Sequence, residues 1–373
     1  MTLKTLKRIA FHLNCLERGG AERVVSNLAN RFAAEGYEVY VATEWQGEDE
    51  FELGPRVTRV HVGLRPEDDS KNRVTKFLLR IRYLKEFAKE YKPDVLVAFA
   101  KRANFRALTA VGKSDIPVVI SIRINPIGWY DSFTDQLQIK WLFPRGAGCV
   151  YQTEDQKKFF APYLQEKSRV IMNPISPKYF GVEHPQVKEK AVVHHARLQD
   201  FKNQPLLVKA FLKVHDRHPD YVLRIYGPDA GDGTKQILEK LIADNNAGDF
   251  IFLMGGSDSL EKELPKGEVY AYSSDYEGMP NSLLEAMALG MPVVSTDCPC
   301  GGPREVIEDG VNGFLIPVGD EDALADRICR LIEDKELAKS FGEKAREIEK
   351  VASLDAIYQQ WKEYLEQIVN VRN

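Results

Sequence analysis

Short apolar runs alternate with longer amphipathic stretches along most of this chain, and that rhythm constrains its fold more than any other feature. In the first half the β-rich runs lie at residues 9–13, 37–43, 57–62, 95–99, 118–122, 148–152 and 169–172. Strands that are apolar along most of their length are typical of a parallel sheet covered by helices on both faces. The first half therefore predicts a doubly wound α/β domain.

The rhythm breaks once and then starts again. Residues 173–189 (NPISPKYFGVEHPQVKE) carry three prolines and a glycine without periodicity, as expected of a linker. Further apolar runs follow at residues 191–195, 221–226, 250–254, 268–272 and 293–296, and the chain beyond residue 320 has an almost wholly helical pattern. A chain of 373 residues also exceeds the usual size of one hydrophobic core. We therefore expect two Rossmann-like domains, residues 1–177 and 178–354, facing each other across a cleft.

Charge differs between the two halves. Residues 1–180 contain 29 Lys and Arg against 21 Asp and Glu, whereas residues 181–373 contain 22 against 34. This asymmetry indicates domains with different partners, but the basic residues are not interleaved with stacking aromatics, so nucleic acid is not expected. Residues 1–7 are too short and polar for a signal peptide, and no apolar run approaches the roughly 20 residues of a membrane span. Five irregularly placed cysteines favour a reducing compartment, so we expect a cytoplasmic protein.

Loops that follow strands are the expected ligand sites in such sheets. In the first domain, Gly19 and Gly20 open a helix directly after the first strand. Adjacent glycines let the backbone approach a ligand, and a helix N-terminus favours anions. A tight turn without any ligand explains the same residues equally well.

Two acids in the second domain occupy different settings. Glu277 lies in a polar loop, whereas Glu285 lies inside the apolar helical segment SLLEAMAL. A buried carboxylate is costly unless it is paired, and the diol of a ribose could donate hydrogen bonds to both of its oxygens. The amides between the two acids would suit a diphosphate. The alternatives are a salt bridge from Glu285 to a buried Arg or Lys, and a solvated Glu277.

Two cations follow the first strand of the second domain. Arg197 and Lys202 stand where they could neutralise a departing diphosphate, although solvated surface cations would have the same pattern. Tyr226 and Gly227 end the next strand and leave room for a flat base, although such Gly-Pro turns are also common without ligands.

These motifs resemble glycosyltransferase family 4, whose members adopt the GT-B fold and retain the anomeric configuration of the sugar. The Glu-x7-Glu arrangement of Glu277 and Glu285 carries the resemblance. It is supported over nearly the whole chain, in the family's order, by GGAER, MNPIS, ARLQDFKNQPLLVKAF, LRIYGPDAGDG and GGPREVIEDGVNGFLIP.

The resemblance implies a role for each matching residue. Glu277 would face the hydroxyls of the donor hexose, Glu285 would hold the ribose, and Arg197 and Lys202 would bind the diphosphate. The remaining residues expected to border the donor are Gly19, Gly20, Tyr226, Gly227, Gly278, Met279, Pro280, Asn281 and Ser282. A C-terminal helix, at about residues 355–373, would cross back to complete the first domain.

One element departs from the family pattern. Many relatives carry a histidine beside the reacting sugar in the first domain, but residues 62–183 here contain no histidine. The corresponding loop reads SIRINP, which makes Arg123 and Asn125 candidates for orienting donor or acceptor. Lys101 and Arg102 are rival candidates, with solvated charges as the alternative.

The expected reaction moves a hexosyl or N-acetylhexosaminyl unit from a nucleotide-diphosphate sugar, UDP being the commonest, to a glycan or lipid-linked acceptor. The setting would be bacterial surface polysaccharide or glycoconjugate synthesis. Asp320-Glu321-Asp322 is predicted to begin a helix rather than to bind metal, so no metal or cofactor is expected. The competing classes are a GT-B epimerase or phosphorylase and a non-catalytic sensor of nucleotide sugars.

Residues 71–85 form a basic segment with six Lys and Arg and no acid. Val74, Phe77, Leu78, Ile81 and Leu84 recur within it at helical spacing. The pattern predicts a helix that packs its apolar face on the sheet and leaves its basic face in solvent. The alternative is a surface that docks on anionic lipid at the inner face of the plasma membrane.

Overall fold

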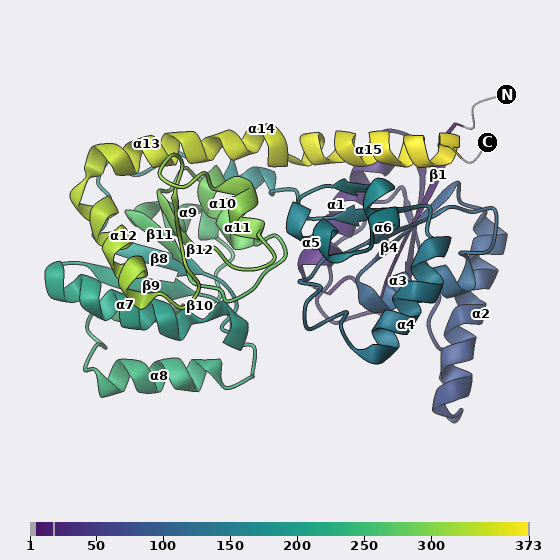
Figure 1. Ribbon diagram of the computed structural model, residues 1–373, viewed down its shortest axis with the longest axis horizontal. Helices are drawn as coiled ribbons and strands as arrows, with labels where there is room; N and C mark the ends of the chain where they lie inside the picture. The colour runs from purple at the N-terminus through teal and green to yellow at the C-terminus, as the bar shows by residue number, and fades with distance from the viewer. Residues whose placement is uncertain (1–4, 18, 372–373) are drawn as a thin grey trace. The chain divides into compact units, whose positions relative to one another are not determined.

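The computed structural model describes residues 5–17 and 19–371 (Figure 1). The chain forms two compact units. Unit 1 comprises the chain up to Asn173 together with the helix that begins at Leu354, and unit 2 comprises residues 174–353. Within the described residues, no helix is both long enough and apolar enough to cross a membrane.

Unit 1 is built on a seven-stranded parallel sheet with the strand order β3-β2-β1-β4-β5-β6-β7. Its strands are β1 Arg8–Leu13, β2 Glu38–Thr43, β3 Val57–His61, β4 Val95–Phe99, β5 Val118–Ser121, β6 Gly148–Tyr151 and β7 Ser168–Val170. Its helices are α1 Gly20–Ala34, α2 Arg73–Tyr91, α3 Lys101–Ala110, α4 Phe133–Leu142, α5 Glu154–Phe159, α6 Pro162–Glu166 and α15 Leu354–Val371.

Both faces of this sheet are buried because successive strand residues point to opposite sides. Along β1, Ile9 and Phe11 pack into a cluster that contains residues of α1 and α15, whereas Ala10 packs into a cluster with residues of α2 and α3. The apolar runs in the sequence are therefore near-continuous because helices cover both faces of the sheet, as predicted.

The C-terminal helix α15 belongs to unit 1. Trp361 and Tyr358 are fully buried against the sheet, and the Trp361 ring stacks on Phe99 of β4 with 5.6 Å between ring centroids. The Tyr364 hydroxyl accepts a hydrogen bond from the Cys149 amide at 3.0 Å and donates to the Lys167 carbonyl at 2.6 Å. This helix thus joins β6 and the chain before β7 through buried polar contacts as well as apolar ones.

Unit 2 is built on a six-stranded parallel sheet with the strand order β10-β9-β8-β11-β12-β13. Its strands are β8 Ala191–His195, β9 Val222–Tyr226, β10 Ile251–Gly255, β11 Val269–Tyr272, β12 Val293–Thr296 and β13 Phe314–Ile316. Its helices are α7 Gln204–Arg217, α8 Thr234–Asp244, α9 Leu260–Glu263, α10 Asn281–Ala288, α11 Gly302–Val306, α12 Glu321–Glu333, α13 Lys335–Ala345 and α14 Glu349–Ala352. Strand β13 was not predicted, because a three-residue run is too short to give a periodic signal.

The prediction for the basic helix was wrong along its first two turns. Val74, Phe77 and Leu78 of α2 are 69, 54 and 57% exposed, so this part of the apolar face does not pack on the sheet. Leu84 and Phe87, further along the helix, are buried. The buried apolar contacts of α2 therefore come from its C-terminal half.

Candidate active site

Two loops at the carboxyl edge of the unit 2 sheet are joined by hydrogen bonds. One follows β8 and the other follows its sheet neighbour β11. The Asp275 amide donates to the Phe201 carbonyl at 2.9 Å, and the Ser273 hydroxyl donates to the Lys202 carbonyl at 3.0 Å. The Asn203 amide group donates to the Asp275 carboxylate at 2.7 Å. These contacts bring together two candidate segments that are about 75 residues apart in the chain.

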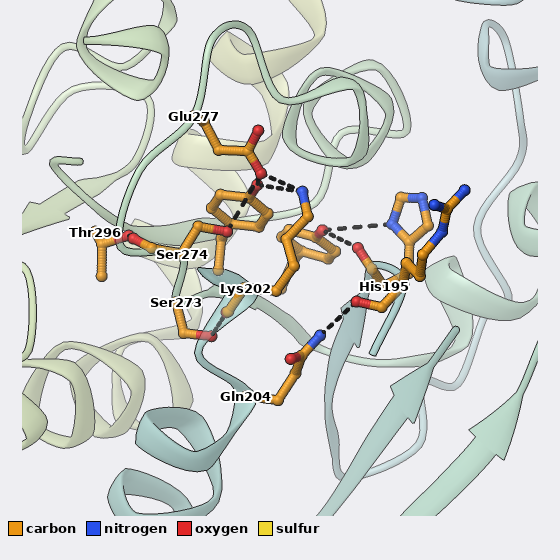
Figure 2. Close-up of polar contacts among 10 residues, drawn as sticks. His195, Lys202, Gln204, Ser273, Ser274, Glu277 and Thr296 are labelled. Carbon is orange, nitrogen blue, oxygen red and sulfur yellow. Dashed lines mark hydrogen bonds and ion pairs between the residues drawn. The ribbon is translucent and has the colours of Figure 1, made fainter. Parts of the chain in front are cut away.

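Lys202 and Glu277 face each other from these loops and form an ion pair (Figure 2). Their side chains are only 15 and 13% exposed. Tyr272, at the end of β11, donates its hydroxyl to the same Glu277 oxygen at 2.7 Å. Burial, together with the Glu277 charge, raises the pKa of Tyr272 well above its usual value, so the phenol keeps its proton and remains a donor. Two predicted residues are thus in contact, and Tyr272 is a third that the sequence reasoning missed.

The backbone of the Glu277 loop is clamped against the segment that precedes α11. The Glu277 amide donates to the Pro299 carbonyl at 2.7 Å, and the Cys300 amide donates back to the Glu277 carbonyl at 2.8 Å. Gly302, at the start of α11, lies so close to Gly278 and Pro280 that a Cβ there would meet the Pro280 ring at 2.7 Å. The GGP sequence therefore holds the Glu277 loop by close backbone contact.

Glu285 lies in the middle of α10 and is buried, with 5% of its side chain exposed. Its carboxylate is 2.9 Å from Nε2 of His195, the last residue of β8. The Tyr270 hydroxyl donates to the His195 carbonyl at 3.2 Å and so helps to hold that strand end. The Glu285 carboxylate is thus paired with a histidine, a partner that the sequence analysis did not name. In the sequence, the pair of histidines that ends the predicted strand at residues 191–195 was the signal that could have revealed the partner of Glu285.

The other donor candidates in unit 2 lie around the same edge. Arg197 is exposed, and its carbonyl accepts from the Gln204 side chain at 2.9 Å. A Cβ on Gly227 would lie 2.7 Å from the Ala196 carbonyl carbon, so only glycine fits where β9 turns past the β8 loop. Tyr226 is buried at the end of β9, and Gly278 and the buried Met279 lie in the Glu277 loop. Pro280 is the N-cap of α10, and Asn281 and Ser282 are in the first turn of that helix.

In unit 1, the predicted residues lie at the carboxyl edge of that unit's own sheet. Gly19 is the N-cap of α1 and Gly20 is its first residue. Arg123 follows β5, and its guanidinium donates to the Ser121 hydroxyl at 2.7 Å and to the Asn173 side-chain oxygen at 3.0 Å. It also lies over Phe99, 4.7 Å from the ring centroid, and burial lowers its pKa to about 9.

Asn125 and the rival cations have more local roles. The buried Asn125 side chain accepts from the Ile127 amide at 3.1 Å, which shapes the loop. Lys101 donates to the Asp135 carboxylate at 2.7 Å and to the Trp129 carbonyl at 2.6 Å, while Arg102 is exposed. Asp320 lies at the start of a helix as predicted, because it caps α12 by accepting from the Ala323 amide at 2.9 Å.

Two family models match this chain. The one described as Glycosyltransferase Family 4 matches residues 18–179, and the one described as Glycosyl transferases group 1 matches residues 176–348. The matched ranges adjoin near the linker and between them include both loops of the candidate site.

Curated relatives and solved structures are similar to this chain over different shares of its length. An exopolysaccharide phosphotransferase, SCO2592 of Streptomyces coelicolor, is 36% identical over 186 residues, which are 49% of this chain and only 19% of that protein. The N-acetylgalactosamine-N,N'-diacetylbacillosaminyl-diphospho-undecaprenol 4-alpha-N-acetylgalactosaminyltransferase of Campylobacter jejuni is 26% identical over 362 residues, covering 91% of this chain and 94% of that one. The structure of Anabaena Alr3699/HepE in complex with UDP and glucose is 20% identical, with a TM-score of 0.77 over 96% of this chain and 98% of that one. This structural likeness shows that the fold is shared.

Proposed function

Since the chain belongs to glycosyltransferase family 4 and has the GT-B fold, we propose that it is a retaining enzyme that uses a nucleotide-diphosphate sugar. The donor would be a UDP-hexose or UDP-N-acetylhexosamine. The acceptor would be a glycan or a lipid-linked saccharide in bacterial surface polysaccharide or glycoconjugate synthesis. The enzyme would act in the cytoplasm, at the inner face of the plasma membrane.

The buried contact between Lys202 and Glu277 is the observation that carries this proposal. It holds a cation and an anion together at the edge of the sheet where ligands bind in such folds. In the donor complex, Glu277 would accept hydrogen bonds from sugar hydroxyls, while Lys202 and Arg197 would bind the diphosphate. Glu285, oriented by His195, would accept from the ribose.

The reaction would proceed by attack on the face from which the diphosphate departs. The bond from the anomeric carbon to the phosphate oxygen breaks, and the bond from the same carbon to the acceptor oxygen forms. The acceptor proton passes to the departing phosphate oxygen. Lys202 and Arg197 would stabilise the charge of the leaving diphosphate, so no metal ion is required in this scheme. Activity lost in EDTA and restored by magnesium would contradict it.

The acceptor side draws support from charge and from the relatives. Residues 1–180 carry a net positive charge that suits a diphosphate-linked or otherwise anionic acceptor. The Campylobacter relative bears the name of an enzyme acting on a diphospho-undecaprenol saccharide. We propose Arg123 as the residue that orients donor or acceptor, with Asn125 holding its loop.

A thermal-shift screen of nucleotide sugars tests the donor, because a true donor raises the melting temperature by mass action. With the best donor, release of nucleoside diphosphate is expected only when an acceptor saccharide is present. Nucleoside diphosphate release that depends on orthophosphate would indicate a phosphorylase. Isomerisation of the sugar without nucleoside diphosphate release would indicate an epimerase. Binding of the donor without release or isomerisation would indicate a sensor.

Variants test the site residues. Lys202→Ala should lower the rate roughly a hundredfold by loss of leaving-group stabilisation, whereas Lys209→Ala, an exposed lysine on α7, should leave it unchanged. Glu285→Gln should weaken UDP binding. Normal turnover in the first variant, or unaltered UDP affinity in the last, would remove that residue from the proposed site.

A further inference from the structure

Five large apolar side chains between residues 127 and 141 of unit 1 face solvent. Phe133 is 78% exposed, Trp141 67% and Ile127 59%, and Leu137 and Trp129 are also exposed. Phe133, Leu137 and Trp141 stand four residues apart on α4, so they share one face of that helix. These five residues are called the α4 surface below.

The opposite face of α4 holds the helix to unit 1, so the α4 surface is not needed to fold it. Ile139 and Asp135 are buried, and Asp135 pairs with Lys101 at 2.7 Å. Large apolar side chains left in water forgo the free energy that their burial would supply. Contiguous exposed apolar patches of this kind mark interaction sites.

A second exposed apolar surface lies at the same edge of unit 1. Val74, Phe77 and Leu78, in the first two turns of α2, form the α2 surface. Helices α2 and α4 follow β3 and β5 respectively, and helices that follow parallel strands begin at the carboxyl edge of the sheet. Helix α3 lies between them and contacts both (Figure 1).

Exposed cations beside both surfaces favour an anionic partner. Lys71 and Arg73 are exposed beside the α2 surface, and the first turn of α2 contains no acid. Lys140 is exposed on α4 next to Trp141, while the exposed Asp131 accepts from the Gly128 amide at 2.9 Å and so caps its own turn. Tryptophan and phenylalanine flanked by lysine and arginine are the residues that enter the headgroup layer of anionic membranes.

We propose that the α4 and α2 surfaces together form a membrane-docking face that inserts shallowly into an anionic lipid bilayer. The α4 surface supplies the aromatic anchors, and the cations of α2 supply electrostatic attraction. This inference deepens the proposed function, because docking at the carboxyl edge of unit 1 would bring that edge to a lipid-linked acceptor.

Co-sedimentation of the full chain with vesicles tests the proposal without any donor or acceptor. Vesicles of phosphatidylcholine alone are compared with vesicles that also contain phosphatidylglycerol. Binding is expected only to the anionic vesicles and should weaken as salt rises. The double variant Phe133→Ser/Trp141→Ser should bind about tenfold or more weakly, because two interfacial anchors are lost. Phe77→Ser/Leu78→Ser should also weaken binding.

The matched control is Val187→Ser/Ile237→Ser, which removes two exposed apolar side chains from unit 2 and should leave vesicle binding unchanged. Fluorescence provides a second measurement, since brominated lipid should quench the exposed Trp129 and Trp141 but not the buried Trp361. Absence of vesicle binding by the parent chain would overturn the proposal. So would undiminished binding by the α4 double variant, or a parent chain that self-associates through these residues instead. None of these outcomes depends on turnover with a soluble acceptor. Failure of the membrane-docking proposal can therefore be distinguished from failure of the proposed function.

Discussion

Replacing Gly302 by alanine should damage the donor site without unfolding the protein. Gly302 begins α11, outside the two loops that carry Lys202 and Glu277. A Cβ at this position would lie 2.7 Å from the Pro280 ring and nearer still to the Gly278 carbonyl oxygen, whereas real Cβ contacts below 3.0 Å are essentially unknown. The backbone of Gly302 is not in the left-handed region, so the added methyl acts by contact and not by backbone strain.

The magnitude follows from the displacement that is needed. The obstructing atoms at Gly278 are backbone, which cannot swing away as a flexible side chain can, so the loop must move by about 1 Å. A misplacement of about 1 Å in a catalytic site can cost about a hundredfold in rate. We therefore expect kcat/KM of Gly302→Ala to fall by about that factor, with weaker UDP binding.

The assay compares nucleoside diphosphate release and UDP calorimetry for three proteins. These are the parent chain, Gly302→Ala and the control Gly248→Ala, whose added Cβ would meet nothing within 4 Å. Circular dichroism establishes that each variant is folded. A folded Gly302→Ala protein with parental kcat/KM and UDP affinity would refute the idea that this glycine positions the Glu277 loop.

Three further predictions concern stability. Burial lowers the pKa of His194 from 6.5 to about 3, so below pH 6.5 only the unfolded chain gains the proton. Through this residue, the free energy of unfolding should fall by about 2 kcal/mol as the pH is lowered from 6.5 to about 5. Urea unfolding at a series of pH values measures this fall. The prediction is contradicted if the free energy of unfolding of His194→Gln depends on pH as steeply as that of the parent chain. Tyr364→Phe removes the hydroxyl that pairs with the Cys149 amide and the Lys167 carbonyl. It should lower the free energy of unfolding, measured with urea, by about 1–3 kcal/mol. An unchanged free energy of unfolding would contradict this prediction. Asp320→Ala should cost about 1 kcal/mol by loss of the α12 cap while leaving turnover intact, and loss of activity instead would reopen the triplet as a metal site.

Every strand except the short β13 could be predicted because each is a local pattern, and the run 191–195 matches β8 end to end. The partners of the site residues could not, because they are set by sheet order. Glu285 meets His195, ninety residues earlier in the chain, only because α10 follows β11 and β11 pairs with β8. Sequence spacing carries no such information, although the rule that ligands lie at carboxyl edges did predict that the loops of Lys202 and Glu277 lie at one edge of the sheet.

The error on α2 has a different cause. Periodicity predicts which residues share a face, but not how much of that face the sheet can cover. A helix of 19 residues is about 28 Å long, whereas five-residue strands such as β3 and β4 extend about 17 Å. The first turns of α2 therefore extend past the sheet, and their apolar residues remain exposed.

Arg123 shows how a local rule can be broken where function is expected. The guanidinium donates hydrogen bonds to the neutral Ser121 and Asn173 side chains, and one of its nitrogens is buried without a partner among the described residues. The same cation lies over Phe99 and Trp361, so α15 helps to enclose it. A desolvated cation without a carboxylate is costly to the folded state. Violations of this kind concentrate at functional sites, where an anionic ligand can supply the missing charge. This unbalanced buried cation, in the loop that lacks the family's histidine, is the structural reason for our proposal that Arg123 orients donor or acceptor.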